Sequence, residues 1–140
     1  MRTAGLVLVI DDDPVVRDVM RRILEADGFA VATAEDGDSG LSSFAEINPD
    51  LAIVDIVMPG KEGIATILDL REARPDARIL AITGGGGFIA SDLLRIAELI
   101  GADNSLKKPF TPAALLAMVK RCLVSLEADA PKEMPATPYQ

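Results

Sequence analysis

Three short apolar runs in this chain each end on a polar residue. Residues 6–10 (LVLVI) lead into Asp11, residues 51–54 (LAIV) lead into Asp55, and residues 77–83 (ARILAIT) end on Thr83. Runs this short that are rich in Val and Ile predict strands covered on both faces rather than helices. The sequence therefore predicts buried strands whose last positions carry carboxylate or hydroxyl groups.

Amphipathic stretches between the strands predict helices. Apolar residues recur at helical spacing over residues 14–26, 39–47, 62–73, 88–100 and 112–127. Asp13 before Pro14 and Thr111 before Pro112 are typical helix caps, so we expect Asp13 to be a cap rather than a metal ligand. Two weaker strands are predicted over residues 29–34 and, at an edge of the sheet, over residues 103–107.

Helical spacing also predicts which side chains face the core. The predicted buried positions of the five helices, in turn, are Val15, Val16, Val19, Met20, Ile23 and Leu24; Leu41, Phe44, Ala45 and Ile47; Ile64, Ile67 and Leu68; Ile89, Leu93, Ile96, Ala97 and Ile100; and Leu115, Leu116, Val119, Cys122, Leu123 and Leu126. Phe88, Leu94 and Leu99 fall outside the predicted stripe of the fourth helix. Cys122 is accordingly expected in the core rather than as a redox group.

Five strands that alternate with five helices predict an α/β fold, a parallel sheet with helices on two faces and right-handed crossovers. Among doubly wound sheets, the flavodoxin-like order 2-1-3-4-5 suits five such units. The predicted domain covers residues 1–127. Residues 128–140 contain three prolines and almost no apolar periodicity, so we expect a flexible Pro-rich tail there.

Composition narrows the possible functions. A chain of 140 residues, 49% of them hydrophobic, is long enough for one globular domain. Its net charge of −8 disfavours a nucleic-acid surface, so we expect no direct nucleic-acid binding. The absence of histidine excludes Ser-His and Cys-His nucleophile pairs and zinc sites with histidine ligands. Apolar runs too short for a membrane and a single cysteine predict a cytoplasmic protein without membrane contact.

The polar residues that follow the strands are expected to meet at one edge of the sheet. In the predicted order, Asp11 and Asp12 lie beside Asp55, with Thr83 on the next strand and Lys108 beyond it. Three carboxylates stay ionised together only when positive charge is supplied, and one lysine and a divalent cation would supply it. Mg²⁺ fits because it prefers oxygen ligands and commonly binds through a carboxylate or two plus a phosphate.

Such a site suits phosphoryl transfer onto a carboxylate. Asp55 would be the in-line nucleophile, Thr83 would hydrogen-bond the transferring group, and Lys108 would neutralise its charge. The backbone carbonyl of Val57, two residues past Asp55, would complete the shell of the metal ion. The charge added to Asp55 can be followed by movement of Thr83 and Lys108, which gives a switch.

Four motifs carry a resemblance to a known family. They are VIDDDP from residue 9, VDIVMPG from residue 54, AIT from residue 81 and KKPF from residue 107. In this order and spacing, up to about residue 127, the chain resembles a receiver domain of the response-regulator family from two-component signalling. The resemblance implies that Asp55 accepts a phosphoryl group from a sensor histidine kinase or a histidine phosphotransfer protein. It implies no enzymatic activity beyond phosphorylation and dephosphorylation of Asp55.

The resemblance also implies roles for the other site residues. Asp12 would ligate Mg²⁺ directly and Asp11 would act mainly through water. Thr83 would be the switch hydroxyl, and Lys108 would pair with the phosphate, with a cis bond between Lys108 and Pro109. The output would be binding of a downstream protein target through the fourth helix, the fifth strand and the fifth helix.

The chain departs from the family pattern at two places. Ser105 stands three positions before Lys108, where family members commonly carry an aromatic switch residue. The run Gly84–Gly87 follows Thr83 and gives the backbone unusual freedom. One hypothesis is that this run reorders on phosphorylation. The alternative is a loop without a role of its own.

Three other interpretations remain open at this level. Asp55 alone is also typical of a loop-entry or capping residue. The chain is either a stand-alone receiver or the N-terminal regulatory receiver of a longer DNA-binding or enzymatic response regulator. A magnesium-dependent phosphatase with an aspartyl intermediate usually has a second Asp two residues after the nucleophile, where this sequence has Val57.

Overall fold

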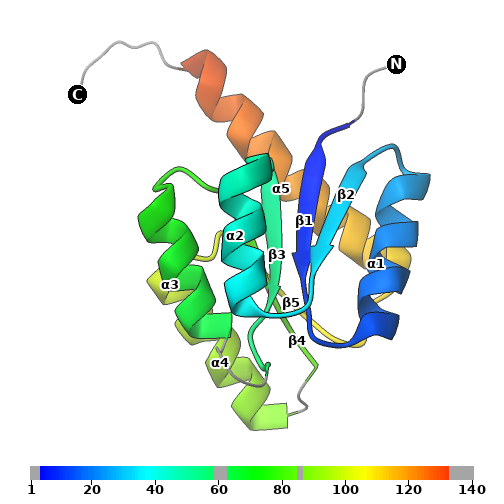
Figure 1. Cartoon of the computed structure of the whole chain (residues 1–140), viewed down its shortest axis with the longest axis vertical. Coiled ribbons are helices and arrows are strands. Elements are labelled where there is room, and N and C mark those ends of the chain that lie inside the picture. The colour runs from blue at the N-terminus through cyan, green and yellow to red at the C-terminus, as the bar shows by residue number, and fades with distance from the viewer. Residues whose placement is uncertain (1–3, 59–62, 85–86, 133–140) are drawn as a thin grey trace.

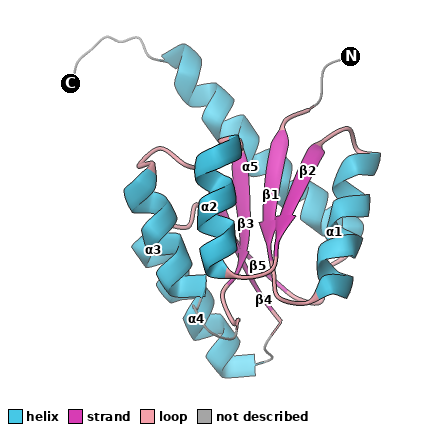
Figure 2. Cartoon of the chain, viewed as in Figure 1, coloured by secondary structure: helices cyan, strands magenta, loops and turns pink. Residues whose placement is uncertain are grey.

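The predicted alternation of strands and helices is confirmed (Figure 1, Figure 2). The computed structural model describes residues 4–58, 63–84 and 87–132. The elements are β1 (Leu6–Ile10), α1 (Pro14–Ala26), β2 (Ala30–Ala34), α2 (Gly37–Ile47), β3 (Leu51–Asp55), α3 (Gly63–Ala73), β4 (Ile79–Thr83), α4 (Gly87–Ile100), β5 (Asn104–Lys107) and α5 (Pro112–Lys132).

The five strands form one parallel sheet in the order β2-β1-β3-β4-β5, as the sequence predicts. Strand β1 lies between β2 and β3, and its last residue, Ile10, pairs with Ala34 on one side and Val54 on the other. The direction of winding reverses at β1, and ligands bind at the carboxyl ends of the strands at such a point.

Helices cover the sheet on two faces. Helices α1 and α5 pack on one face, over a core that includes Val7, Val9, Met20, Leu24, Ile53, Leu115, Val119 and Cys122. Helices α2, α3 and α4 pack on the other, over a core that includes Leu8, Ile10, Phe44, Val54, Ile67, Leu70, Leu94 and Ala97. Every residue of β3 and β4 is buried, which explains their apolar sequences. Cys122 is a core residue as predicted, and burial raises the pKa of its thiol.

The two predicted helix caps are confirmed. The side chain of Asp13 accepts a hydrogen bond from the backbone N–H of Val15 at 2.9 Å. The hydroxyl of Thr111 accepts one from the N–H of Ala114 at 3.0 Å. Each cap satisfies a backbone donor that the first turn of the helix leaves without a partner.

Several predicted helix faces are wrong. Val15 is 68% exposed, and Val19, Leu68 and Ile96 are exposed as well, whereas Leu94 is buried. Apolar residues cover a wider arc of these helices than the narrow strip that packs on the sheet, so periodicity alone does not fix the rotation of each helix. In α4 the buried strip is centred on Leu94 and Ala97, one turn apart, which turns Ile96 outward.

The last helix ends later than the sequence predicts. Helix α5 continues to Lys132, past the expected end of the domain at Glu127. The change in composition after Glu127 therefore does not mark the end of the helix, and Ala128 and Ala130 are good helix formers. Residues 133–140, residues 59–62, two glycines of the run after Thr83, and the side chains of Phe88, Ile89 and Leu126 lie outside the described part. Within the described ranges, no helix has both the length and the apolar content needed to cross a bilayer.

Candidate functional site

The polar residues singled out in the sequence lie at the carboxyl edge of the sheet. Asp11 directly follows β1, Asp55 is the last residue of β3, Thr83 is the last residue of β4, and Lys108 directly follows β5. Asp12 is the next residue of the turn between β1 and α1. Parallel pairing of β1 with β3 brings Asp11 and Asp55 together although they are far apart in the sequence.

Three carboxylates form a tight cluster at this edge. One oxygen from each of Asp11, Asp12 and Asp55 lies within 4.8 Å of the others. Asp11 is fully buried and Asp55 is 4% exposed, whereas Asp12 is exposed to solvent. Mutual repulsion therefore acts between two carboxylates that water cannot screen.

Lys108 supplies positive charge to the cluster. Its Nζ lies 3.0 Å from Asp11 Oδ2 and 3.6 Å from Asp55 Oδ2. Its backbone N–H donates to the carbonyl of Thr83 at 2.7 Å, which ties the residue to the end of β4. One ammonium group thus faces two buried carboxylates, and the cluster of three carboxylates keeps a net negative charge.

Burial and the surplus of negative charge both change the pKa values of Asp55 and Lys108. Burial, and then the charge of Asp11, raise the pKa of Asp55 to about 6, although Lys108 and the N–H of Val57 act in the opposite direction. Burial alone would lower the pKa of Lys108, but its hydrogen bond to Asp11 and the charge of Asp55 outweigh this and raise it. The lysine therefore stays protonated at neutral pH, and the site disfavours the ionised form of Asp55.

The donor set fits a hard divalent cation. All three side-chain donors are carboxylate oxygens, and they converge on a region where positive charge is deficient. The N–H of Val57 donates to Asp55 Oδ1 at 3.2 Å, which holds the residue next to the carboxylate, and its side chain is exposed. Oxygen donors with excess negative charge suit Mg²⁺ better than metals that prefer histidine or cysteine.

A glycine next to Asp55 was not identified from the sequence. Gly63 is the first residue of α3 and is buried. A Cβ atom on Gly63 would lie 2.2 Å from Ile56 Cα and 2.3 Å from the carbonyl oxygen of Asp55. Only glycine lets α3 approach the end of β3 this closely. No local sequence signal reports a contact between segments that meet only in the folded chain.

Ser105, at the position of the expected aromatic residue, contacts α4. Its hydroxyl donates to Glu98 Oε2 at 2.5 Å. This hydrogen bond joins β5 to α4 on the side of the sheet away from β2. The run Gly84–Gly87 falls into three parts. Gly84 lies beside Lys108, the next two glycines lie outside the described ranges, and Gly87 is the first residue of α4.

An apolar groove of about 410 Å³ opens beside the acidic cluster. It is lined by residues of α1 and of the segments that follow β4 and β5, namely Val15, Val16, Val19, Met20, Gly84, Lys108, Pro109 and Phe110. The peptide bond between Lys108 and Pro109 is cis, as the resemblance implied. Lys108 belongs to both the groove and the cluster, so the two are continuous.

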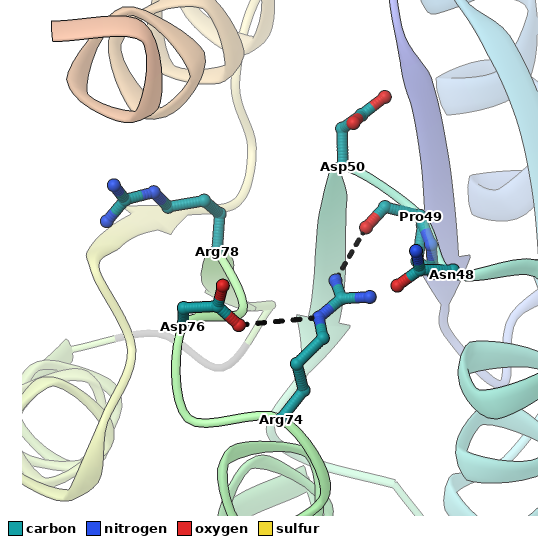
Figure 3. A pocket seen from close by; sticks show the side chains of 6 residues that line it. All are labelled: Asn48, Pro49, Asp50, Arg74, Asp76 and Arg78. Carbon is teal, nitrogen blue, oxygen red and sulfur yellow. Dashed lines mark hydrogen bonds and ion pairs between the residues drawn. The ribbon is translucent and has the colours of Figure 1, made fainter. Parts of the chain in front are cut away.

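A second hollow, of about 180 Å³, lies at the opposite end of the sheet, where β3 and β4 begin (Figure 3). There Arg74 donates to the carbonyl of Pro49 at 2.7 Å, and its Nε lies 3.8 Å from Asp76 Oδ1. Its Cζ lies 4.5 Å from the centroid of the Phe44 ring. Figure 3 shows Arg78 pointing away from this group. Arg74 is thus engaged in contacts within the chain, at the edge of the sheet away from the acidic cluster.

Comparison with known proteins decides the family. A family model described as the response regulator receiver domain matches residues 7–120. The chain belongs to this family. The receiver is 34% identical over 134 residues to response regulator MprA of Mycobacterium sp. (strain KMS), covering 95% of this chain and 56% of MprA. It is 36% identical over 117 residues to transcriptional regulatory protein CseB of Streptomyces coelicolor, covering 84% of this chain and 48% of CseB. The receiver thus spans about half the length of these relatives.

Solved structures confirm the fold of the receiver. A CheY-like response regulator receiver domain protein from Methanospirillum hungatei JF-1 superimposes with a TM-score of 0.79 at 30% identity, covering 89% of this chain and 97% of that one. NtrX from Brucella abortus superimposes with a TM-score of 0.85 at 26% identity, covering 97% of this chain and 31% of that one. The second match is to one part of a longer protein.

Proposed function

We propose that Asp55 is the phosphoacceptor of this receiver and takes a phosphoryl group from a protein histidine. The supporting observation is the buried Asp55 carboxylate, which lies within 4.8 Å of two other carboxylates and 3.6 Å from the Lys108 ammonium. Negative charge is concentrated where a nucleophile is needed, and a cation is in place for the incoming group.

The proposed transfer is an in-line displacement. A carboxylate oxygen of Asp55 attacks the phosphorus of a phosphohistidine on the partner. A P–O bond forms as the P–N bond breaks, and the electron pair of that bond stays on the imidazole nitrogen, which takes up a proton. Lys108 neutralises charge on the transferring oxygens, and the hydroxyl of Thr83 hydrogen-bonds the acyl phosphate that results.

Mg²⁺ is the proposed cofactor. Asp12, Asp55 and the backbone carbonyl of Val57 would hold the ion directly, and Asp11 would act through a water molecule. The bound ion supplies positive charge that offsets repulsion between the carboxylates and the incoming phosphoryl oxygens. The exposed position of Asp12 and the surplus negative charge of the cluster support this assignment.

The apolar groove is the proposed docking surface for the phosphodonor, a sensor histidine kinase or a histidine phosphotransfer protein. The donor must bring its phosphohistidine to Asp55, so its surface has to cover the neighbourhood of the site. Val15 and Val19 offer exposed apolar area there, continuous with the cluster through Lys108. Val15→Ser should slow transfer from a protein donor and leave transfer from acetyl phosphate unchanged. Leu68→Ser, on the exposed side of α3, is the matched control.

The proposed output is binding of a downstream protein target through α4, β5 and α5. The hydrogen bond between Ser105 and Glu98 lies within this surface and joins two of its elements. The net charge of −8 supports a protein target rather than direct contact with nucleic acid. Two-component phosphotransfer of this kind takes place in the cytoplasm, which is the proposed location.

The length of the relatives favours a second candidate. Because the matched relatives are about twice as long, the receiver also fits the role of an N-terminal regulatory part of a DNA-binding or enzymatic response regulator. The reading frame beyond Gln140 distinguishes the two candidates. A stop codon supports the stand-alone receiver, and a continuing frame supports the regulatory part.

Phosphorylation by a small donor tests the proposal. The protein is incubated with acetyl phosphate, with Mg²⁺ or with EDTA, and its intact mass is measured for the wild type and Asp55→Asn. The proposal predicts one added phosphoryl group on the wild type with Mg²⁺, and none on Asp55→Asn. Equal labelling of both proteins, or equal labelling in EDTA, would contradict it. Sustained turnover of an exogenous phosphate ester would favour a phosphatase instead.

A further inference from the structure

We infer that Arg17 is a positioning residue that sets the orientation of Asp12 for binding the cation. Arg17 lies in α1 and is partly buried. Its Nη1 donates to the backbone carbonyl oxygen of Asp11 at 2.7 Å. That carbonyl belongs to the peptide group between Asp11 and Asp12, so the guanidinium group fixes the plane from which the Asp12 side chain extends.

Other contacts hold the turn on both sides of this peptide. The side chain of Asp11 accepts from the N–H of Asp13 at 2.9 Å and from Lys108 Nζ at 3.0 Å. The N–H of Asp11 donates to the carbonyl of Ala34 at 3.1 Å. These bonds anchor the residue before Asp12, and Arg17 adds the bond to the peptide that leads into it. The exposed carboxylate of Asp12 depends on this backbone for its direction.

The charge of Arg17 and its hydrogen bond have opposite effects on cation binding. As a positive charge near the cluster, the guanidinium group repels a divalent cation, so its removal should strengthen binding if charge alone matters. As a support for the backbone, it holds a ligand in place, so its removal should weaken binding. The sign of the change therefore distinguishes a positioning role from a simple charge effect.

Arg21 is the matched control. It lies one turn further along α1 and contacts the carboxylates of Asp18, at 2.7 Å, and Glu25, at 3.7 Å. These contacts lie within the helix and do not reach the acidic cluster. Arg21→Gln therefore removes the same positive charge from the same helix without touching the turn that carries Asp12.

The inference rests on the proposed magnesium site, and calorimetric titration with MgCl₂ tests it. We expect Arg17→Gln and Arg17→Lys each to raise the Kd for Mg²⁺ about tenfold, because outer residues that orient metal ligands commonly contribute this much. Lysine keeps the charge but lacks the planar fork of donors. Arg21→Gln should leave the Kd unchanged or slightly lower. At saturating Mg²⁺, acetyl phosphate should phosphorylate both Arg17 variants at the same maximal rate as the wild type.

Each other outcome has a definite meaning. An unchanged or lower Kd in Arg17→Gln, or a wild-type Kd in Arg17→Lys, would overturn the positioning role while the magnesium site stands. A maximal rate that stays low at any Mg²⁺ concentration would show general damage to the fold and would also overturn it. Urea unfolding in EDTA measures such damage separately. If the wild type takes up no Mg²⁺, the proposed function fails, and this inference fails with it.

Discussion

Replacing Asp55 with asparagine should stabilise the fold when no divalent cation is present. Asp55 is 4% exposed and shares the Lys108 ammonium with Asp11. The ammonium lies closer to Asp11 than to Asp55. Folding raises the pKa of Asp55 from 3.8 to about 6, and at 1.36 kcal/mol per unit this amounts to about 3 kcal/mol at neutral pH. The asparagine amide matches the hydrogen bonds around the site less well, so we expect a net gain of about 1–2 kcal/mol.

The pH dependence of this gain has a definite sign. A raised pKa means that the folded state binds the proton more tightly than the unfolded state. The wild type therefore loses stability as the pH rises from about 4 to 6, and its stability is then constant with respect to this group. The gain in stability from Asp55→Asn should be largest above pH 7. Towards pH 4 the ionisation term vanishes and only the poorer hydrogen bonding of the amide remains, so Asp55→Asn should there be less stable than the wild type by about 1–2 kcal/mol.

Urea unfolding followed by far-UV circular dichroism measures the effect, because the chain has no tryptophan. Mg²⁺ should close the gap at pH 7.5, since it binds the folded wild type and stabilises it by mass action. Asp76→Asn is the control, because Asp76 is 88% exposed, and its stability should change by less than about 0.5 kcal/mol. A variant Asp55→Asn that is no more stable than the wild type at pH 7.5 in EDTA would refute the reasoning.

Three further predictions concern the stability of the fold and the lifetime of the phosphoryl group. Gly63→Ala should destabilise the fold by at least about 2 kcal/mol, because its Cβ would lie 2.2 Å from Ile56 Cα; an unchanged urea midpoint would contradict this. Arg71→Met should cost about 2–4 kcal/mol, since its guanidinium donates to the carbonyls of Pro75, Ala77 and Gly101; the exposed Arg22→Met is the control, and equal midpoints would count against it. The residues two positions after Asp55 and Thr83 are Val57 and Gly85, which have no polar side chain to orient water. The phosphoryl group on Asp55 should therefore persist for minutes. Its loss within seconds, measured by intact mass, would contradict this.

The sheet and the meeting of the acidic residues follow from the sequence because the signals are short in range and strong. Buried parallel strands need unbroken apolar runs, and the polar residue after each run marks its carboxyl end. Once the order 2-1-3-4-5 is inferred, Asp11 and Asp55 have to be neighbours. The cap at Asp13 is equally local, since it depends on the first turn of one helix.

Features that depend on how elements pack could not be predicted in this way. The exposure of Val15 and Leu68 follows from the rotation of each helix on the sheet, which periodicity leaves open. The need for glycine at position 63 arises from the close approach of α3 to the end of β3. The contact of Arg17 with the Asp11 carbonyl likewise depends on where the first turns of α1 lie. In each case the partner is supplied by the folded chain and not by the neighbouring sequence.

The central claim is that the cluster of Asp11, Asp12 and Asp55 keeps a net negative charge despite the nearby Lys108, and that it binds a hard cation. Calorimetric titration of the unphosphorylated wild type and of Asp12→Asn with MgCl₂ at pH 7.5 tests it most directly. We expect one Mg²⁺ per chain in the wild type at millimolar concentration, and much weaker uptake in Asp12→Asn. No uptake by the wild type, or equal uptake by both proteins, would contradict the account.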